Sequence, residues 1–176
     1  MTRLVLVFGI LAGIIELALL GLSMGLASDH GILGMVLGYL SMLIALSLVF
    51  VGVRKYRDEH RGGVIRFWPA LGVGLGIAGI AALFYVLGWE AYMWSTDYRF
   101  MTDYVAATLK AMEAKGASAG QLAQARAEFA EFAAMYENPV TRMGITLTEI
   151  APVALLVPLI SAALLRRPGF MPARAR

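Results

Sequence analysis

Residues 4–26 read LVLVFGILAGIIELALLGLSMGL, an apolar run with a single charged side chain, Glu16. At a rise of about 1.5 Å per residue, a helix of this length crosses a hydrocarbon core of about 30 Å. Three more apolar runs follow, at about 34–53, 68–89 and 140–165. The sequence therefore predicts an all-α, polytopic membrane protein in which residues 1–176 form one membrane domain with four transmembrane helices.

The overall composition excludes an ordinary soluble domain. Hydrophobic residues make up 60% of the 176 residues and the mean hydropathy is +0.73, whereas soluble domains hold about 45–50% apolar residues. The chain has no cysteine, which excludes disulfides, zinc–thiolate sites and thiol catalysis. The net charge of +3 is small, and we predict no nucleic-acid partner and no cofactor.

The first run could also be a cleaved signal peptide, because Arg3 precedes it and Gly25-Leu26-Ala27 resembles a cleavage site. The apolar region of a signal peptide is about 7–15 residues long. Residues 4–26 are longer than that and contain Glu16. We therefore predict that this run is kept as the first span.

The basic residues are divided unevenly between the two sides of the predicted membrane. One side has five, of which four lie between the third and fourth spans and the fifth, Arg142, lies at the start of the fourth span; the other ten lie on the opposite side. The ten are Arg3, Arg54, Lys55, Arg57, Arg61, Arg66, Arg166, Arg167, Arg174 and Arg176. Basic segments stay on the cytoplasmic side. An Arg-, Ala- and Gly-rich composition is typical of bacteria, so we predict a bacterial inner-membrane protein with both termini in the cytoplasm.

Residues 97–138, between the third and fourth runs, are polar enough to lie in water and should face outward. Two sets of apolar residues repeat there at helical spacing. They are Met101, Tyr104, Val105, Thr108 and Met112, and then Leu122, Ala125, Phe129, Phe132, Ala133 and Tyr136. Gly116 suits a helix end and Ser118 a helix start, which predicts an external helical hairpin. Its apolar stripe is either the seam of the hairpin or a contact surface for a protein partner.

Small residues recur along three of the predicted spans. The sets are Gly9, Ala12, Gly13 and Ser23, then Gly34, Gly38, Ser41, Ala45 and Gly52, and then Gly72, Gly76, Gly79, Ala82 and Val86. Helices in lipid associate by close packing through such residues. The stripes predict tight contact within the bundle, with a homo-oligomer seam through a glycine-rich face as the alternative.

Three carboxylates lie in or at the edge of the predicted spans, namely Glu16, Glu90 and Glu149. A charged group at the bilayer centre costs at least about 2.5 kcal/mol, so it usually has a function or a partner. We predict that Glu16 and Glu149 lie at comparable depth, face the bundle interior and could meet, and that Glu90 lies near the outer surface. Arg142, Thr146, Glu149 and Pro152 are predicted to share one side of the fourth span.

Several short motifs resemble the DUF4199 family of small bacterial membrane proteins of unknown function. The central one is Tyr56-Arg57-Asp58 followed by Gly62-Gly63, Ile65, Phe67 and Ala70. Phe100-Met101 with Tyr104, Tyr136 with Asn138-Pro139, and Thr148–Pro152 resemble later blocks. The resemblance implies four spans with an external helical insert, and it carries over no catalytic residue.

Four kinds of function remain for comparison. A metal site could use Glu16, Glu90, Glu149 and His30, but these donors lie far apart in sequence, and we predict no metal. Catalysis needs a nucleophile within reach of a base. Ser23, Ser41 and Ser161 have no histidine beside them in sequence, so we predict no catalytic residue. The two stronger hypotheses are a non-enzymatic structural, assembly or regulatory bundle and, as the alternative, a proton- or cation-coupled transporter that uses Glu16, Glu90, Glu149 and Arg142.

Overall fold

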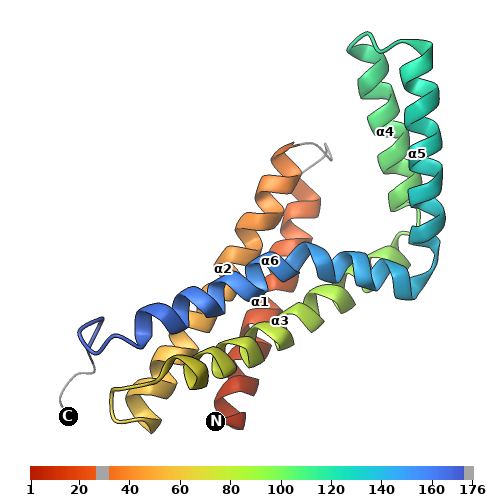
Figure 1. The fold of residues 1–176 in the computed structure, drawn as a ribbon. Helices are drawn as coiled ribbons and strands as arrows, with labels where there is room; N and C mark the ends of the chain where they lie inside the picture. The colour runs from red at the N-terminus through yellow and green to blue at the C-terminus, as the bar shows by residue number, and fades with distance from the viewer. Residues whose placement is uncertain (27–31, 173–176) are drawn as a thin grey trace. The chain divides into compact units, whose positions relative to one another are not determined.

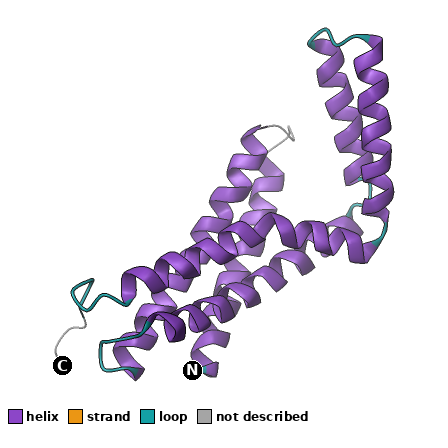
Figure 2. Cartoon of the chain, viewed as in Figure 1, coloured by secondary structure: helices purple, strands orange, loops and turns teal. Residues whose placement is uncertain are grey.

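The computed structural model describes residues 1–26 and 32–172, and these fold into six α-helices with no strand (Figures 1 and 2). The helices are α1 (Thr2–Leu26), α2 (Ile32–His60), α3 (Phe67–Ser95), α4 (Phe100–Ala114), α5 (Ala119–Glu137) and α6 (Pro139–Leu165). Four of them, α1, α2, α3 and α6, are long and apolar enough to span a membrane. The predicted all-α fold with four spans and a hairpin between the third and fourth is confirmed. The predicted turn at residues 28–30 and the basic residues Arg174 and Arg176 lie outside the described residues.

Contacts within the chain divide it into two compact units. Unit 1 comprises Met1–Val86 and Glu149–Arg176, and unit 2 comprises Leu87–Thr148. Unit 1 therefore holds α1, α2 and most of α3 and α6, whereas unit 2 holds the hairpin with the adjoining ends of α3 and α6.

In unit 1, α1 and α2 pack along each other, and glycines allow α3 to approach both of them closely. A Cβ atom added to Gly9 would lie 2.7 Å from Cβ of Ile80, and one added to Gly76 would lie 2.9 Å from Cγ1 of Val5. These distances are too short for a real Cβ, so α1 and α3 approach closely because each has a glycine where the other has a branched side chain. Gly52 brings α2 equally close to Ile77.

The predicted glycine stripes are right for α1 and only partly right for α2 and α3. Gly9, Ala12, Gly13, Glu16 and Ser23 are all buried on α1. In contrast, Gly38, Gly72 and Gly79 face open space, and Gly74, which the prediction omitted, contacts Pro158 of α6 and Val49 of α2. On α3 the predicted stripe therefore packs at Gly76, Ala82 and Val86 but not at Gly72 and Gly79.

Helix α2 continues past the predicted end of the second span at residue 53 and ends at His60. Two ion pairs, each between residues one helical turn apart, support this polar extension. They are Arg54–Asp58 at 3.6 Å and Lys55–Glu59 at 3.7 Å. The chain then turns at Gly62 and Gly63, whose φ angles of 61° and 85° favour glycine.

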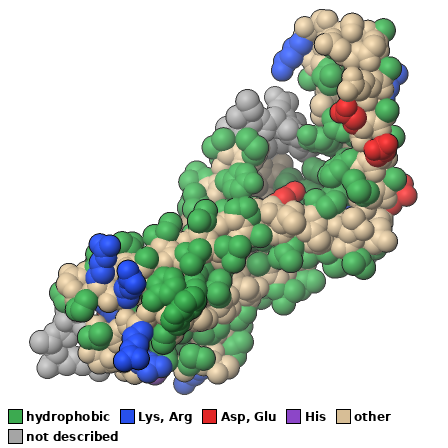
Figure 3. Space-filling model, in the orientation of Figure 1, with side chains coloured by type: hydrophobic (Ala, Val, Ile, Leu, Met, Phe, Trp, Pro, Cys, Tyr) green, Lys and Arg blue, Asp and Glu red, His purple; other side chains and the backbone are tan. Residues whose placement is uncertain are grey.

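Large apolar side chains cover much of the surface of the long helices. Exposed examples in unit 1 are Leu6, Ile10, Ile14, Leu40, Leu43, Leu83, Leu155, Leu156 and Ile160. Figure 3 shows this apolar surface and the Lys and Arg side chains that gather at one end of the unit. An apolar surface of this extent is typical of contact with lipid and not with water.

In unit 2, α4 and α5 form the predicted hairpin, and its turn has the predicted chemistry. Gly116 has a φ of 83° just after α4. Ser118 is the N-cap of α5, where its hydroxyl accepts a hydrogen bond from the Gln121 backbone while the Gln121 side chain accepts one from the Ser118 backbone. The rings of Tyr104 and Phe129 meet edge to face at 6.1 Å across the seam.

Candidate functional site

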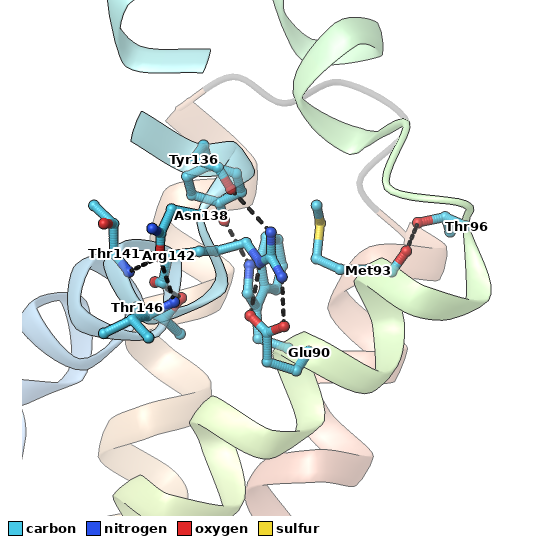
Figure 4. Close-up of polar contacts among 10 residues, drawn as sticks. Glu90, Met93, Thr96, Tyr136, Asn138, Thr141, Arg142 and Thr146 are labelled. Carbon is cyan, nitrogen blue, oxygen red and sulfur yellow. Dashed lines mark hydrogen bonds and ion pairs between the residues drawn. The ribbon is translucent and has the colours of Figure 1, made fainter. Parts of the chain in front are cut away.

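The strongest polar contact in unit 2 is a two-pronged ion pair between Arg142 of α6 and Glu90 of α3 (Figure 4). Arg142 donates from Nε to Oε1 of Glu90 at 2.7 Å and from Nη2 to Oε2 at 2.6 Å. The Arg142 side chain is 2% exposed and that of Glu90 15%. This parallel arrangement is the strongest geometry that an arginine and a carboxylate can form.

The remaining contacts of Arg142 connect the pair to the hairpin. Its Nη1 donates to the Tyr136 carbonyl at 2.9 Å, and its guanidinium lies 5.0 Å from the ring centroid of Tyr98 and 5.9 Å from that of Tyr136. The indole of Trp89, one residue before Glu90, donates to the Tyr136 hydroxyl. We call Trp89, Glu90, Tyr136 and Arg142 the clamp, because together they join α3, the end of α5 and the start of α6.

The local sequence explains why Arg142 points toward the clamp. Asn138 caps α6, since its Oδ1 accepts hydrogen bonds from the backbone of Val140 at 2.9 Å and of Thr141 at 3.3 Å. Pro139 follows at the first helical position, where a missing N–H costs nothing. Arg142 is thus in the first turn of α6 and reaches the segment that has just left α5.

In unit 1, the Glu16 carboxyl group is buried and has few hydrogen bonds to replace its lost hydration. It is 1% exposed, and its Oε2 has no hydrogen-bond partner among the described residues. Its Oε1 lies 3.4 Å from the Ser41 hydroxyl. That hydroxyl also donates to the Gly38 carbonyl at 2.7 Å. A hydroxyl has one hydrogen, so the shorter bond uses it and the contact with Glu16 lacks a donor.

Glu149 differs from its predicted position. It is exposed, whereas Ile150 and Val153 form the buried face of α6 in unit 1. Its Oε2 accepts a hydrogen bond from the Tyr85 hydroxyl at 3.2 Å. The interior position predicted for Glu149 is wrong, because one residue along a helix turns a side chain by about 100°. The two acids have different partners, and no hydrogen bond joins them among the described residues.

The carboxylates considered as metal ligands are thus held by separate groups. Glu16 lies beside Ser41, Glu90 is bound by Arg142 and Glu149 by Tyr85. Within residues 1–26 and 32–172, no three His, Asp or Glu side chains are grouped so that they could hold a metal ion. His30, the fourth residue considered, lies outside the described residues.

Arg57 has a structural role that the sequence did not indicate. It is fully buried on α2 and donates to the carbonyls of Phe170 at 2.9 Å and Met171 at 2.5 Å, and to Asp58 at 2.6 Å. Phe170 also meets Phe50 edge to face at 6.3 Å. Asp58 therefore accepts one hydrogen bond from Arg57, and the chain after α6 accepts the others.

Unit 2 also contains a cavity of about 460 Å³ beside the clamp. Six residues on one face of α5 line it, and Met93, Tyr98, Met101 and Arg142 are among those opposite. The sequence showed the apolar stripe of α5 but not that part of it is left open. The pair of Glu90 and Arg142 could have been found, because one ends the third predicted span and the other begins the fourth, at the same side of the membrane.

Comparisons with known proteins place the chain by sequence alone. Neither the curated proteins nor the solved structures include a match to it. A family model described as a protein of unknown function, DUF4199, matches residues 7–167. Since this match covers most of the 176 residues, the chain belongs to the DUF4199 family.

Proposed function

We propose that this protein is a non-enzymatic membrane protein with a structural, assembly or regulatory role, and that its hairpin presents a contact surface to another protein. The observation that carries the proposal is the clamp. Arg142 and Glu90 neutralise each other, so this buried pair has no uncompensated charge to use in proton or ion exchange. Their effect is to fix the base of the hairpin, which a contact surface needs because binding costs less when the surface is already ordered.

The proposal includes a location in a bacterial inner membrane, with both termini in the cytoplasm and the hairpin outside. Its support is the charge distribution. Basic residues gather around the end of α2 and the start of α3, as Figure 3 illustrates. Residues 97–138 instead hold six acidic and four basic residues. The positive-inside rule therefore favours a cytoplasmic turn between α2 and α3.

Photocrosslinking in living cells tests the contact surface. A photoreactive residue is placed at exposed Gln124 or Ala127 of α5, and at Leu155 of α6 as a control that faces lipid. We expect both hairpin positions to give the same adduct, identified by mass spectrometry, and the control to give none. Arg142→Met should weaken this adduct, since it releases the base of the hairpin. The absence of a shared protein adduct from Gln124 and Ala127 would argue against the proposal.

Glu16 supports a second candidate, a proton- or cation-coupled transporter. A buried carboxyl oxygen without a partner is unfavourable, and a proton or small cation bound at Glu16 would remove that cost. Flux of candidate cations and of protons into proteoliposomes tests this, with Glu16→Gln compared with Glu149→Gln as the matched control. Loss of flux in the Glu16 variant alone would favour transport. Equal behaviour of both variants and the wild type would leave Glu16 with a structural role.

A further inference from the structure

The cavity of unit 2 follows one face of α5. Along α5 it is lined by Arg126, Phe129, Ala130, Ala133, Tyr136 and Glu137. These positions repeat every three or four residues and so form one face of the helix. Arg126 and Glu137 are eleven residues apart, which corresponds to about 16 Å along the helix axis. The cavity therefore extends over roughly this length of α5.

The middle of the cavity is apolar and adaptable. Phe129, Ala130 and Ala133 face Met101 and Val105 of α4. Methionine side chains fit ligands of irregular or variable shape because they are flexible and polarisable. A volume of about 460 Å³ is within the range of ligand sites, which is about 300–1,000 Å³.

The charges at the two ends of the cavity differ. At one end Arg142 already has its charge balanced by Glu90 and a hydrogen bond to Tyr136, so it does not need an anion from a ligand. At the other end Arg126 is exposed and has no ion-pair partner among the residues that the structure describes. Glu137 lies near the Arg142 end and disfavours a second negative charge there. One anionic group at Arg126 and an apolar body toward Arg142 would match this pattern.

The position of the cavity in the chain indicates where such a ligand comes from. The Arg142 end is lined by Met93 and Pro139, which belong to the end of α3 and the start of α6. Trp94 and Tyr98 are exposed beside it. Exposed Trp and Tyr at the ends of spans are typical of the membrane–water interface. The Arg142 end of the cavity is thus at the end that the membrane would occupy.

We propose that this cavity binds the acyl chain of a lipid that carries an acidic head group, with the head group at Arg126 and the chain directed toward Arg142. Such binding does not depend on whether the hairpin also contacts a protein, so it goes beyond the function proposed above. Failure of one does not imply failure of the other.

Trp89 provides a direct readout. Its indole is bonded to Tyr136, whose side chain lines the cavity, and Trp89 itself is buried. Replacing the exposed Trp68 and Trp94 by phenylalanine leaves Trp89 as the single tryptophan. Dibrominated stearate is then added to the purified protein in detergent. Bromine quenches tryptophan at short range, and we expect saturable quenching at a low ratio of fatty acid to detergent.

Paired variants locate the binding. Ala133→Leu fills the cavity and should weaken binding by about tenfold or more, because the added methylene groups overlap the ligand. Ala134→Leu is the control, since Ala134 is exposed on α5 and outside the cavity. Arg126→Gln should weaken binding of stearate several-fold and leave binding of brominated stearyl alcohol unchanged. The control is Lys110→Gln, which should change the binding of neither ligand because Lys110 is exposed and does not line the cavity.

Native mass spectrometry of protein extracted from membranes gives an independent result. We expect the wild type and the Ala134 variant to retain one acidic lipid that the Ala133 variant loses. If Ala133→Leu destabilises unit 2, Ala130→Met is used in place of that variant, because it narrows the same cavity. Quenching that does not saturate, or that is equal in the Ala133 and Ala134 variants, would overturn the proposal. A cavity that receives a protein segment or stays empty would produce that result.

Discussion

Separating Arg142 from Glu90 should be the most costly change in unit 2 that leaves the core residues in place. Two hydrogen bonds of 2.7 and 2.6 Å join them, and a hydrogen bond to a charged group contributes about 1.5–3 kcal/mol. Removal of one partner from a buried ion pair costs about 3–5 kcal/mol, in agreement with two such bonds. We expect Arg142→Met to lie near the lower limit, because the Glu90 side chain is 15% exposed and can recover some hydration.

A double-mutant cycle distinguishes this pairing from a loss of packing. Arg142→Met and Glu90→Leu are measured singly and together, and residues in direct contact show interaction energies of up to about 3 kcal/mol. We expect a coupling of about 2–3 kcal/mol. The double variant should then be more stable than the sum of the single effects indicates, since it leaves no unpaired charge.

The assay follows Trp89 fluorescence during unfolding by sodium dodecyl sulfate in mixed micelles, with Trp68 and Trp94 replaced by phenylalanine. Trp89 belongs to the clamp, so it reports on unit 2. The control is Arg99→Met, because Arg99 is exposed and its side chain donates a hydrogen bond of 3.4 Å to the Thr96 carbonyl. We expect this control to change stability by less than about 0.5 kcal/mol. Additive single effects, or a cost of Arg142→Met no greater than that of the control, would refute the reasoning.

Three further predictions concern the spans, the hairpin and the topology. Gly9→Val should destabilise unit 1 by more than about 1–3 kcal/mol, the cost of ordinary overpacking, because the new Cβ would lie 2.7 Å from that of Ile80. The control is Gly21→Val, since a Cβ at Gly21 meets nothing within 4 Å. Equal melting temperatures of the two variants would contradict the packing of α1 on α3. Ser118→Ala should cost about 1 kcal/mol through loss of the cap, read as faster hydrogen exchange in the first turn of α5, while an unchanged exchange rate would count against the capping box. Single cysteines at the exposed positions Lys115 and Arg61 should react with an impermeant thiol reagent from opposite sides of the membrane, and labelling of Lys115→Cys from the cytoplasm would reverse the proposed orientation.

The sequence predicted those features that depend on local chemistry. The four spans follow from the length of the apolar runs, and the hairpin turn follows from Gly116 and Ser118, whose conformations those residue types favour. The end of α2 was placed too early because hydropathy ends at residue 53, whereas the helix continues through residues that form ion pairs one turn apart. Apolar length measures the part of a helix that lies in lipid, not the whole helix.

The direction of side chains around a span was harder to predict than the span itself. In water a polar face identifies the exposed side of a helix, but a span in lipid is apolar on all sides. The spacing of Gly72, Gly76 and Gly79 therefore gave no means to tell the packed face from the lipid face, and Gly72 and Gly79 in fact meet open space. The same ambiguity misplaced Glu149 by one position relative to Ile150, which is 0% exposed.

The three carboxylates of the spans are compensated to different degrees, and this difference ranks them as functional candidates. Glu90 is fully paired by Arg142, so its charge is explained by the stability of unit 2. Glu149 is exposed and holds one hydrogen bond, from Tyr85. Glu16 is almost completely buried, and Ser41, its hydrogen-bond partner among the described residues, already uses its hydrogen in a bond to Gly38. A buried carboxyl that its own fold leaves unsatisfied is retained at a cost. If any acidic residue of this chain exchanges a proton or binds a cation, Glu16 is therefore the one to replace first, and Glu90 is the one whose loss should act through stability alone.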